Sequence, residues 1–191
     1  MLNLHSFEPI SEIYGPGKRF VIWTQGCNLA CKGCWNMETW SFKENLLFSS
    51  SKLLNLILNY KDDIEGITIL GGEPLLQKES LFDFIKLVKK ETDLSIMLYT
   101  GFEKDQFTFL DKKIISKIDI LIAGRYIKEK RDIFLTWRGS SNQKIEFITD
   151  KYNKNDIPQE CNMIEIDINS DGSIKLIGYP ENSLLKFIKT F

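Results

Sequence analysis

The chain has 191 residues and a formal net charge of −1, from 25 Lys and Arg against 26 Asp and Glu. With 43% hydrophobic and 27% charged residues, the composition is that of a globular protein rather than a disordered one. The balanced charge argues against nucleic acid as the main partner, because such binding usually needs an excess of basic side chains. The length predicts a single domain over residues 1–191.

No apolar run reaches the roughly 20 residues that span a bilayer, so we expect no membrane segment. Residues 1–18 lack a basic region followed by an apolar stretch, which predicts no secretory signal and a cytoplasmic location. Thiols stay reduced in the cytoplasm. Because three of the 4 cysteines also crowd into residues 27–34, a disulfide framework is not expected.

Short apolar segments alternate with amphipathic ones along the chain, and this pattern predicts strands and helices in turn. The predicted strands are residues 20–24, 66–70, 94–99, 119–123 and 144–149. The predicted helices begin near the N-cap serines 49–51, after Pro74 and at about residue 104, and a closing helix is expected around Leu184, Leu185 and Ile188. Between them, residues 164–168 and 174–177 flank Ser170-Asp171-Gly172, which indicates a hairpin.

Strands that alternate with helices favour right-handed crossovers and a mostly parallel sheet. The predicted fold class is therefore α/β, with a mostly parallel sheet and a C-terminal hairpin. Such sheets bind ligands at the carboxyl ends of their strands. Four polar or glycine-rich segments follow predicted strands, namely residues 26–34, 71–74, 100–101 and 124–125. We expect these four segments to surround one site.

The first of these segments is a cysteine loop in which Cys27, Cys31 and Cys34 are separated by three and by two residues. This spacing lets one loop bring three thiolates to a single centre, either zinc or an iron–sulfur cluster. A cubane held by three thiolates leaves one iron without a protein ligand, and that vacancy can bind a substrate or cofactor. The alternative is a structural zinc site whose fourth ligand is Cys161 or His5.

The cysteine loop, together with Gly71-Gly72-Glu73-Pro74, resembles the radical S-adenosylmethionine enzymes. The resemblance implies a [4Fe-4S] cluster on Cys27, Cys31 and Cys34, with S-adenosylmethionine bound through its amino and carboxylate groups to the remaining iron. It further implies that one electron cleaves the sulfonium to give a 5'-deoxyadenosyl radical, which abstracts hydrogen from a substrate. We accordingly expect a partial (βα)6 barrel. No side chain is assigned a catalytic role, because the radical chemistry belongs to the cofactors.

A narrower resemblance is to the activating enzymes of anaerobic, glycyl-radical ribonucleotide reductases. It rests on Gly33 before the last cysteine, on Trp35 and Asn36 after it, and on residues 99–101, 138–143 and 177–180. It implies hydrogen abstraction from a glycine of a partner glycyl-radical protein, with a flavodoxin or ferredoxin-type reductant. Two alternatives stay open. One is a radical enzyme acting on a nucleotide precursor, similar to 7-carboxy-7-deazaguanine synthase, or on a peptide. The other is a non-enzymatic zinc module or electron carrier.

The remaining candidates are residues that could hold S-adenosylmethionine. Gly71 and Gly72 leave the backbone open to the methionine ammonium, and Glu73 adds negative charge there. The segment 100–101 suits ribose or carboxylate, Arg125 can pair with the carboxylate, and the polar loop around residues 141–142 suits ribose or adenine. A turn, a salt bridge or a capped loop would use the same residues. The full candidate set is Gly33, Trp35, Asn36, Gly71, Gly72, Glu73, Pro74, Thr100, Gly101, Arg125, Ser141 and Asn142, whereas Phe102, Phe107 and Phe109 are expected in the core.

Overall fold

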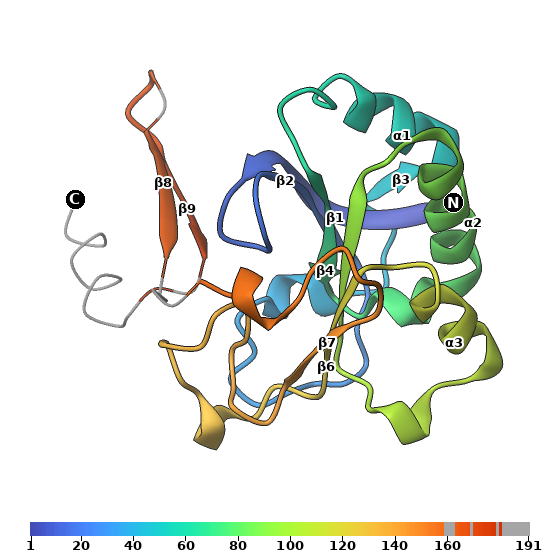
Figure 1. The fold of residues 1–191 in the computed structure, drawn as a ribbon. Helices are drawn as coiled ribbons and strands as arrows, with labels where there is room; N and C mark the ends of the chain where they lie inside the picture. The colour runs from blue at the N-terminus through green and yellow to red at the C-terminus, as the bar shows by residue number, and fades with distance from the viewer. Residues whose placement is uncertain (159–162, 169, 179, 181–191) are drawn as a thin grey trace.

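A computed structural model describes residues 1–158, 163–168, 170–178 and 180, and its main feature is a mixed sheet (Figure 1). In spatial order, the strands of this sheet are β3 (Leu46–Phe48), β1 (Leu2–Ser11), β2 (Arg19–Thr24), β4 (Gly66–Gly71), β5 (Ser95–Thr100), β6 (Ile120–Ala123) and β7 (Lys144–Phe147). The four central strands, β2, β4, β5 and β6, pair in parallel, while β1, β3 and β7 join antiparallel at the edges. The predicted α/β class with a parallel central sheet is therefore confirmed.

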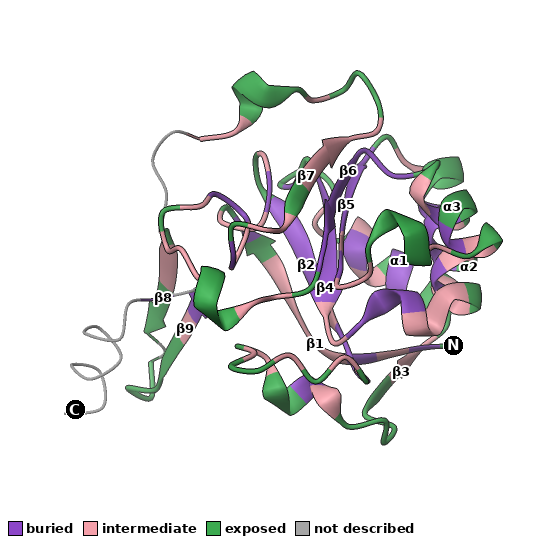
Figure 2. Ribbon diagram, turned by 90° about the horizontal axis from the view of Figure 1, so that it is seen from below, coloured by how far each residue is buried: buried purple, intermediate pink, exposed green. Residues whose placement is uncertain are grey.

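Three α-helices lie together on one face of this sheet (Figures 1 and 2). They are α1 (Ser50–Leu58), α2 (Lys78–Glu91) and α3 (Phe109–Ile115). Ser49 caps α1, since its hydroxyl accepts from the Lys52 N–H at 3.2 Å, and Thr108 caps α3 in the same way. Short 3-10 helices occupy Met37–Trp40 (η1), Pro74–Gln77 (η2), Lys104–Gln106 (η3), Lys128–Lys130 (η4) and Lys154–Asp156 (η5).

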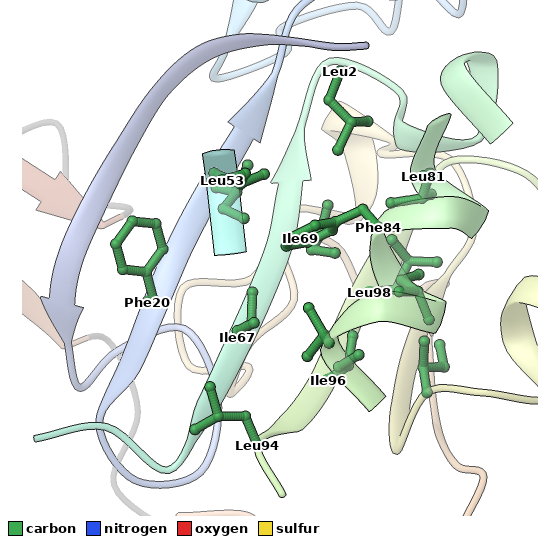
Figure 3. Packing of buried hydrophobic residues seen from close by; sticks show 14 of the residues in the cluster. Leu2, Phe20, Leu53, Ile67, Ile69, Leu81, Phe84, Leu94, Ile96 and Leu98 are labelled. Carbon is green, nitrogen blue, oxygen red and sulfur yellow. The ribbon is translucent and has the colours of Figure 1, made fainter. Parts of the chain in front are cut away.

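The hydrophobic core fills the space between the central strands and the helices. Figure 3 shows Phe84 of α2 beside Ile69 and Leu98 of neighbouring strands, and all three are buried. On the opposite face of the sheet, Met97 and Ile120 pack in a second cluster with other buried residues. Burial on both faces explains why the central strands are continuous apolar runs rather than alternating ones.

A fully buried arginine begins β2 on that second face. The Arg19 guanidinium donates to Thr68 Oγ1 at 2.6 Å, to Ser95 Oγ at 3.0 Å and to the Ile67 carbonyl at 2.8 Å. These acceptors sit on β4 and β5, so the arginine ties three parallel strands together near their amino ends. Such a group is tolerated in the interior because its donors are satisfied.

The predicted hairpin is confirmed as β8 (Ile164–Ile168) and β9 (Ile174–Gly178), an antiparallel pair that stands apart from the main sheet (Figure 1). An ion pair between Lys175 and Glu8 links β9 to β1. The predicted closing helix and Cys161 lie outside the described residues.

Three features differ from the sequence-based prediction. Strands β1 and β3 were not predicted, because β1 mixes polar residues and a proline with its apolar ones and β3 has 3 residues. The third helix begins at Phe109 rather than near residue 104, after the separate turn η3. Phe109 is 74% exposed and is not a core residue, whereas Phe102 and Phe107 do pack against the core. Among the described residues, no helix has both the length and the apolar character that a membrane crossing requires.

Candidate cofactor site

A cavity of about 260 Å³ lies where the parallel strands end. The four segments predicted to surround one site all contribute to its lining. They supply the three cysteines of the loop, then Gly71 to Glu73 after β4, Thr100 and Gly101 after β5, and Gly124 after β6. The prediction that these segments meet is thus confirmed, and it follows from the shared direction of the parallel strands.

Backbone hydrogen bonds join the turn after β4 to the start of the cysteine loop. The Gly72 N–H donates to the Thr24 carbonyl at 2.8 Å, and the Glu73 N–H donates to the Gly26 carbonyl at 2.9 Å. A Cβ on Gly72 would lie 2.4 Å from that same Gly26 oxygen, a backbone atom that cannot swing aside. Gly71 has a φ of +107°, which disfavours any residue with a side chain. The two glycines are therefore needed for this close approach.

The thiols of Cys27, Cys31 and Cys34 are half-buried and line the same cavity. Burial raises the pKa of the Cys27 thiol, and nearby Glu73 adds to the effect. Burial also raises the pKa of Cys31, although the positive charge of Arg125 opposes the rise. Metal binding would displace these protons, since only thiolates act as ligands. No group of three or more His, Cys, Asp or Glu in the described part of the chain is arranged for a single metal ion.

Glu73 is buried at the centre of the site, with a relative exposure of 1%. Its Oε1 accepts from the Thr100 hydroxyl at 2.8 Å and from the Leu75 N–H at 3.0 Å, and its Oε2 accepts from the Gly101 N–H at 2.7 Å. Burial raises the pKa of this carboxyl to about 7, against the lowering effect of those hydrogen bonds. The side chain thus couples the loops that follow β4 and β5.

The other predicted cofactor residues divide into two groups. Trp35 and Asn36 line the cavity with the cysteines, whereas the remaining five predicted positions are not among its lining residues. Two of these five contact each other, because Asn142 Nδ2 donates to the Arg125 carbonyl at 2.8 Å. Their predicted contacts with S-adenosylmethionine stay predictions. The five are Gly33, Pro74, Arg125, Ser141 and Asn142.

Most of the apolar wall of the cavity was not predicted from the sequence. Ile13 and Tyr14 precede β2, Ile133 and Leu135 lie between β6 and β7, and Trp137 adjoins them. Trp137 is 8% exposed and has a φ of +57°, and its Nε1 has no hydrogen-bond partner among the described residues. Apolar residues in loops carry no local signal of a site, so only the tertiary structure reveals this wall.

His5, considered as a fourth zinc ligand, is not among the lining residues of the cavity. Its Nδ1 lies 3.0 Å from Oε1 of Gln25, the residue that follows β2. Cys161, the other residue considered for that role, lies outside the described residues. In the part of the chain that the structure describes, the cysteine loop therefore offers three protein ligands rather than four.

Comparison with known proteins first defines the class. A family described as "4Fe-4S single cluster domain" matches residues 13–146, the stretch that contains the cysteine loop and the loops around the cavity. Activating proteins of anaerobic ribonucleoside-triphosphate reductases are similar over most of the chain. The protein from Haemophilus influenzae is 37% identical over 75% of this chain and 97% of its own length. The one from Vibrio cholerae is 32% identical over 78% and 99%. The one from Enterobacteria phage T4 is 31% identical over 81% and 100%.

The chain belongs to the family of anaerobic ribonucleoside-triphosphate reductase-activating proteins. Among solved structures, QueE from Escherichia coli matches 52% of this chain and 52% of that chain, with 21% identity and a TM-score of 0.41.

The residues of the site fit the [4Fe-4S] cluster that this family implies. Three thiols come from one loop and face one cavity, which suits a cubane with three protein ligands. Gly71 and Gly72 line the same cavity beside these thiols.

Proposed function

We propose that this protein activates an anaerobic ribonucleoside-triphosphate reductase by abstracting hydrogen from a glycine of that enzyme. The observation that carries the proposal is the meeting of the three cysteines with the turn Gly71 to Glu73 in one cavity. The chain also shares 37% identity with an activating protein over nearly the whole length of that relative. These relatives favour a protein substrate over a nucleotide precursor, and they favour an enzyme over a zinc module or an electron carrier.

When bound, the cluster and S-adenosylmethionine supply a 5'-deoxyadenosyl radical. Cys27, Cys31 and Cys34 would hold the cluster, and the backbone at Gly71 and Gly72 would accept the methionine end of S-adenosylmethionine. Glu73 orients Thr100 and Gly101 through the hydrogen bonds described above. The apolar wall around Trp137 would limit the access of water to the reacting centre, which protects a radical from side reactions.

Five further points belong to the same proposal. The four parallel strands and their helices form the described part of a partial (βα)6 barrel, and residues 1–191 form a single domain. The electron comes from a flavodoxin or ferredoxin-type protein. The protein works in the cytoplasm, where its thiols stay reduced. The remaining candidate residues contact S-adenosylmethionine as the sequence analysis predicts.

Anaerobic reconstitution tests the proposal. The loaded protein, reduced with dithionite, is given S-adenosylmethionine with and without the anaerobic ribonucleoside-triphosphate reductase encoded in the same genome. We expect 5'-deoxyadenosine and, in the reductase, the electron paramagnetic resonance signal of a glycyl radical. Cys31→Ala should abolish both, whereas Lys86→Gln, a change on the far side of α2, should abolish neither. Cleavage of S-adenosylmethionine without a glycyl radical in the reductase contradicts the proposed substrate. If S-adenosylmethionine is not cleaved at all, the enzyme class is contradicted.

A further inference from the structure

The segment that follows β6 lies against the cysteine loop. Arg125 Nη2 donates to the Leu29 carbonyl at 2.7 Å, and its positive charge opposes the rise that burial causes in the pKa of the Cys31 thiol. The stem of Lys128 lies over Gly33, where an added Cβ would meet Lys128 Cδ at 3.0 Å. The loop thus receives a positive charge and a hydrogen bond from a segment that is distant in the sequence.

Hydrogen bonds from neighbouring loops fix the backbone around Arg125. The Gly124 N–H donates to the Thr100 carbonyl at 3.0 Å at the end of β5. Gln143 Nε2 donates to the Gly124 carbonyl at 3.1 Å, and Asn142 Nδ2 donates to the Arg125 carbonyl at 2.8 Å. The backbone of this arginine is therefore fixed by two neighbouring loops, although its side chain is exposed. A guanidinium held in this way keeps a defined position over the cysteine loop.

The cysteine loop needs such support. Ala30, between Leu29 and Cys31, has a φ of +49°, in the left-handed region that residues with a side chain rarely adopt. The hydrogen bond from Arg125 ends on the carbonyl of Leu29, the peptide group that joins Leu29 to this strained residue. Strain of this kind persists only where surrounding contacts enforce it.

We propose that Arg125 is a positioning residue that braces the cysteine loop and raises the reduction potential of the cluster bound there. The inference rests on the proposed function, because it needs a cluster on the three cysteines. When one electron passes from an external donor to the cluster, the cluster with its thiolates gains one negative charge. A guanidinium fixed against the cysteine loop stabilises the more negative state, and so favours reduction.

The test is a potentiometric titration of the loaded protein, followed by electron paramagnetic resonance of the reduced cluster with dithionite as the electron donor. Arg125→Gln removes the charge and shortens the side chain, which weakens the contact with the Leu29 carbonyl. We expect its potential to fall so that, at a fixed solution potential, the ratio of reduced to oxidised cluster drops about tenfold, or roughly 59 mV for one electron. Arg125→Lys keeps the charge and should restore most of that loss. Lys86→Gln, the same charge change on α2, should match the wild type.

Iron content gives the second readout. Because the brace is weakened, Arg125→Gln should also lose iron faster than the wild type on exposure to a chelator. Should Arg125→Gln retain no cluster, the reduction potential is measured in Arg125→Lys and Arg125→Met instead. A loaded Arg125→Met variant with the potential of the wild type would overturn the inference. A wild-type potential and iron retention in Arg125→Gln overturn it as well. If the wild type itself binds no cluster, the proposed function fails; if the wild type loads and cleaves S-adenosylmethionine, only the inference is at stake.

Discussion

The buried carboxyl of Glu73 should make the stability of the cluster-free protein depend on pH in a particular direction. Its pKa rises from an ordinary value of 4.5 to about 7, chiefly because burial disfavours the charged form. The folded state therefore holds this proton more tightly than the unfolded chain does. The contribution is fully present below about pH 4.5 and is lost as the pH rises to about 7. At roughly 1.36 kcal/mol per pKa unit, the loss amounts to about 3 kcal/mol.

The assay is urea unfolding of the cluster-free protein at a series of pH values between about 4.5 and 8, for the wild type and for Glu73→Gln. The variant cannot titrate, and one amide N–H of the glutamine must face a backbone or hydroxyl donor, which costs about 1–3 kcal/mol at all pH values. Relative to this variant, the wild type should lose about 3 kcal/mol as the pH rises. Glu79→Gln, on the exposed side of α2, serves as the control and should run parallel to the wild type. Parallel curves for the wild type and Glu73→Gln would refute the reasoning.

Three further predictions concern the core, the turn after β4 and the buried arginine. Phe84→Ala should lower the free energy of unfolding by about 3–5 kcal/mol, because the side chain is fully buried, and a loss under about 1 kcal/mol in urea would contradict this packing. Gly72→Ala should impair iron uptake far more than Gly101→Ala, since the added Cβ meets a backbone oxygen in the first case and the end of a movable leucine side chain in the second. Equal iron content in the two reconstituted variants would contradict this prediction. Arg19→Met should destabilise the fold by about 1–3 kcal/mol, because it leaves buried acceptors without donors. An unchanged midpoint of thermal denaturation would show that these acceptors find other partners.

The sequence predicts the central strands well because burial on both faces makes each of them a continuous apolar run. The edge strand β1 lacks this signal. Its residues Leu2 and Leu4 are buried, but polar residues and Pro9 follow them, and its partner β3 is too short to show any period. Edge strands depend on pairing with a neighbour, and a local pattern does not reveal that pairing.

The same distinction applies to the candidate site, where some features are local in the sequence and others are contacts between distant residues. The cysteine spacing and the turn after β4 are local features, so they can be predicted from the sequence. The hydrogen bond from Arg125 to Leu29 joins residues 96 positions apart, and the bond from Thr100 to Glu73 spans 27. Neither contact follows from spacing or periodicity. The roles of these side chains in linking the loops therefore become visible only in three dimensions.

The central claim is that a single [4Fe-4S] cluster is bound by Cys27, Cys31 and Cys34 and by no fourth protein ligand. The most direct test compares iron content and Mössbauer spectra of four anaerobically reconstituted variants, each with one cysteine changed to alanine. We predict that loss of any one of the three loop cysteines removes the cluster, while Cys161→Ala keeps the full four irons per chain and the wild-type spectrum. A cluster lost in Cys161→Ala, or kept in the three loop variants, would contradict the account.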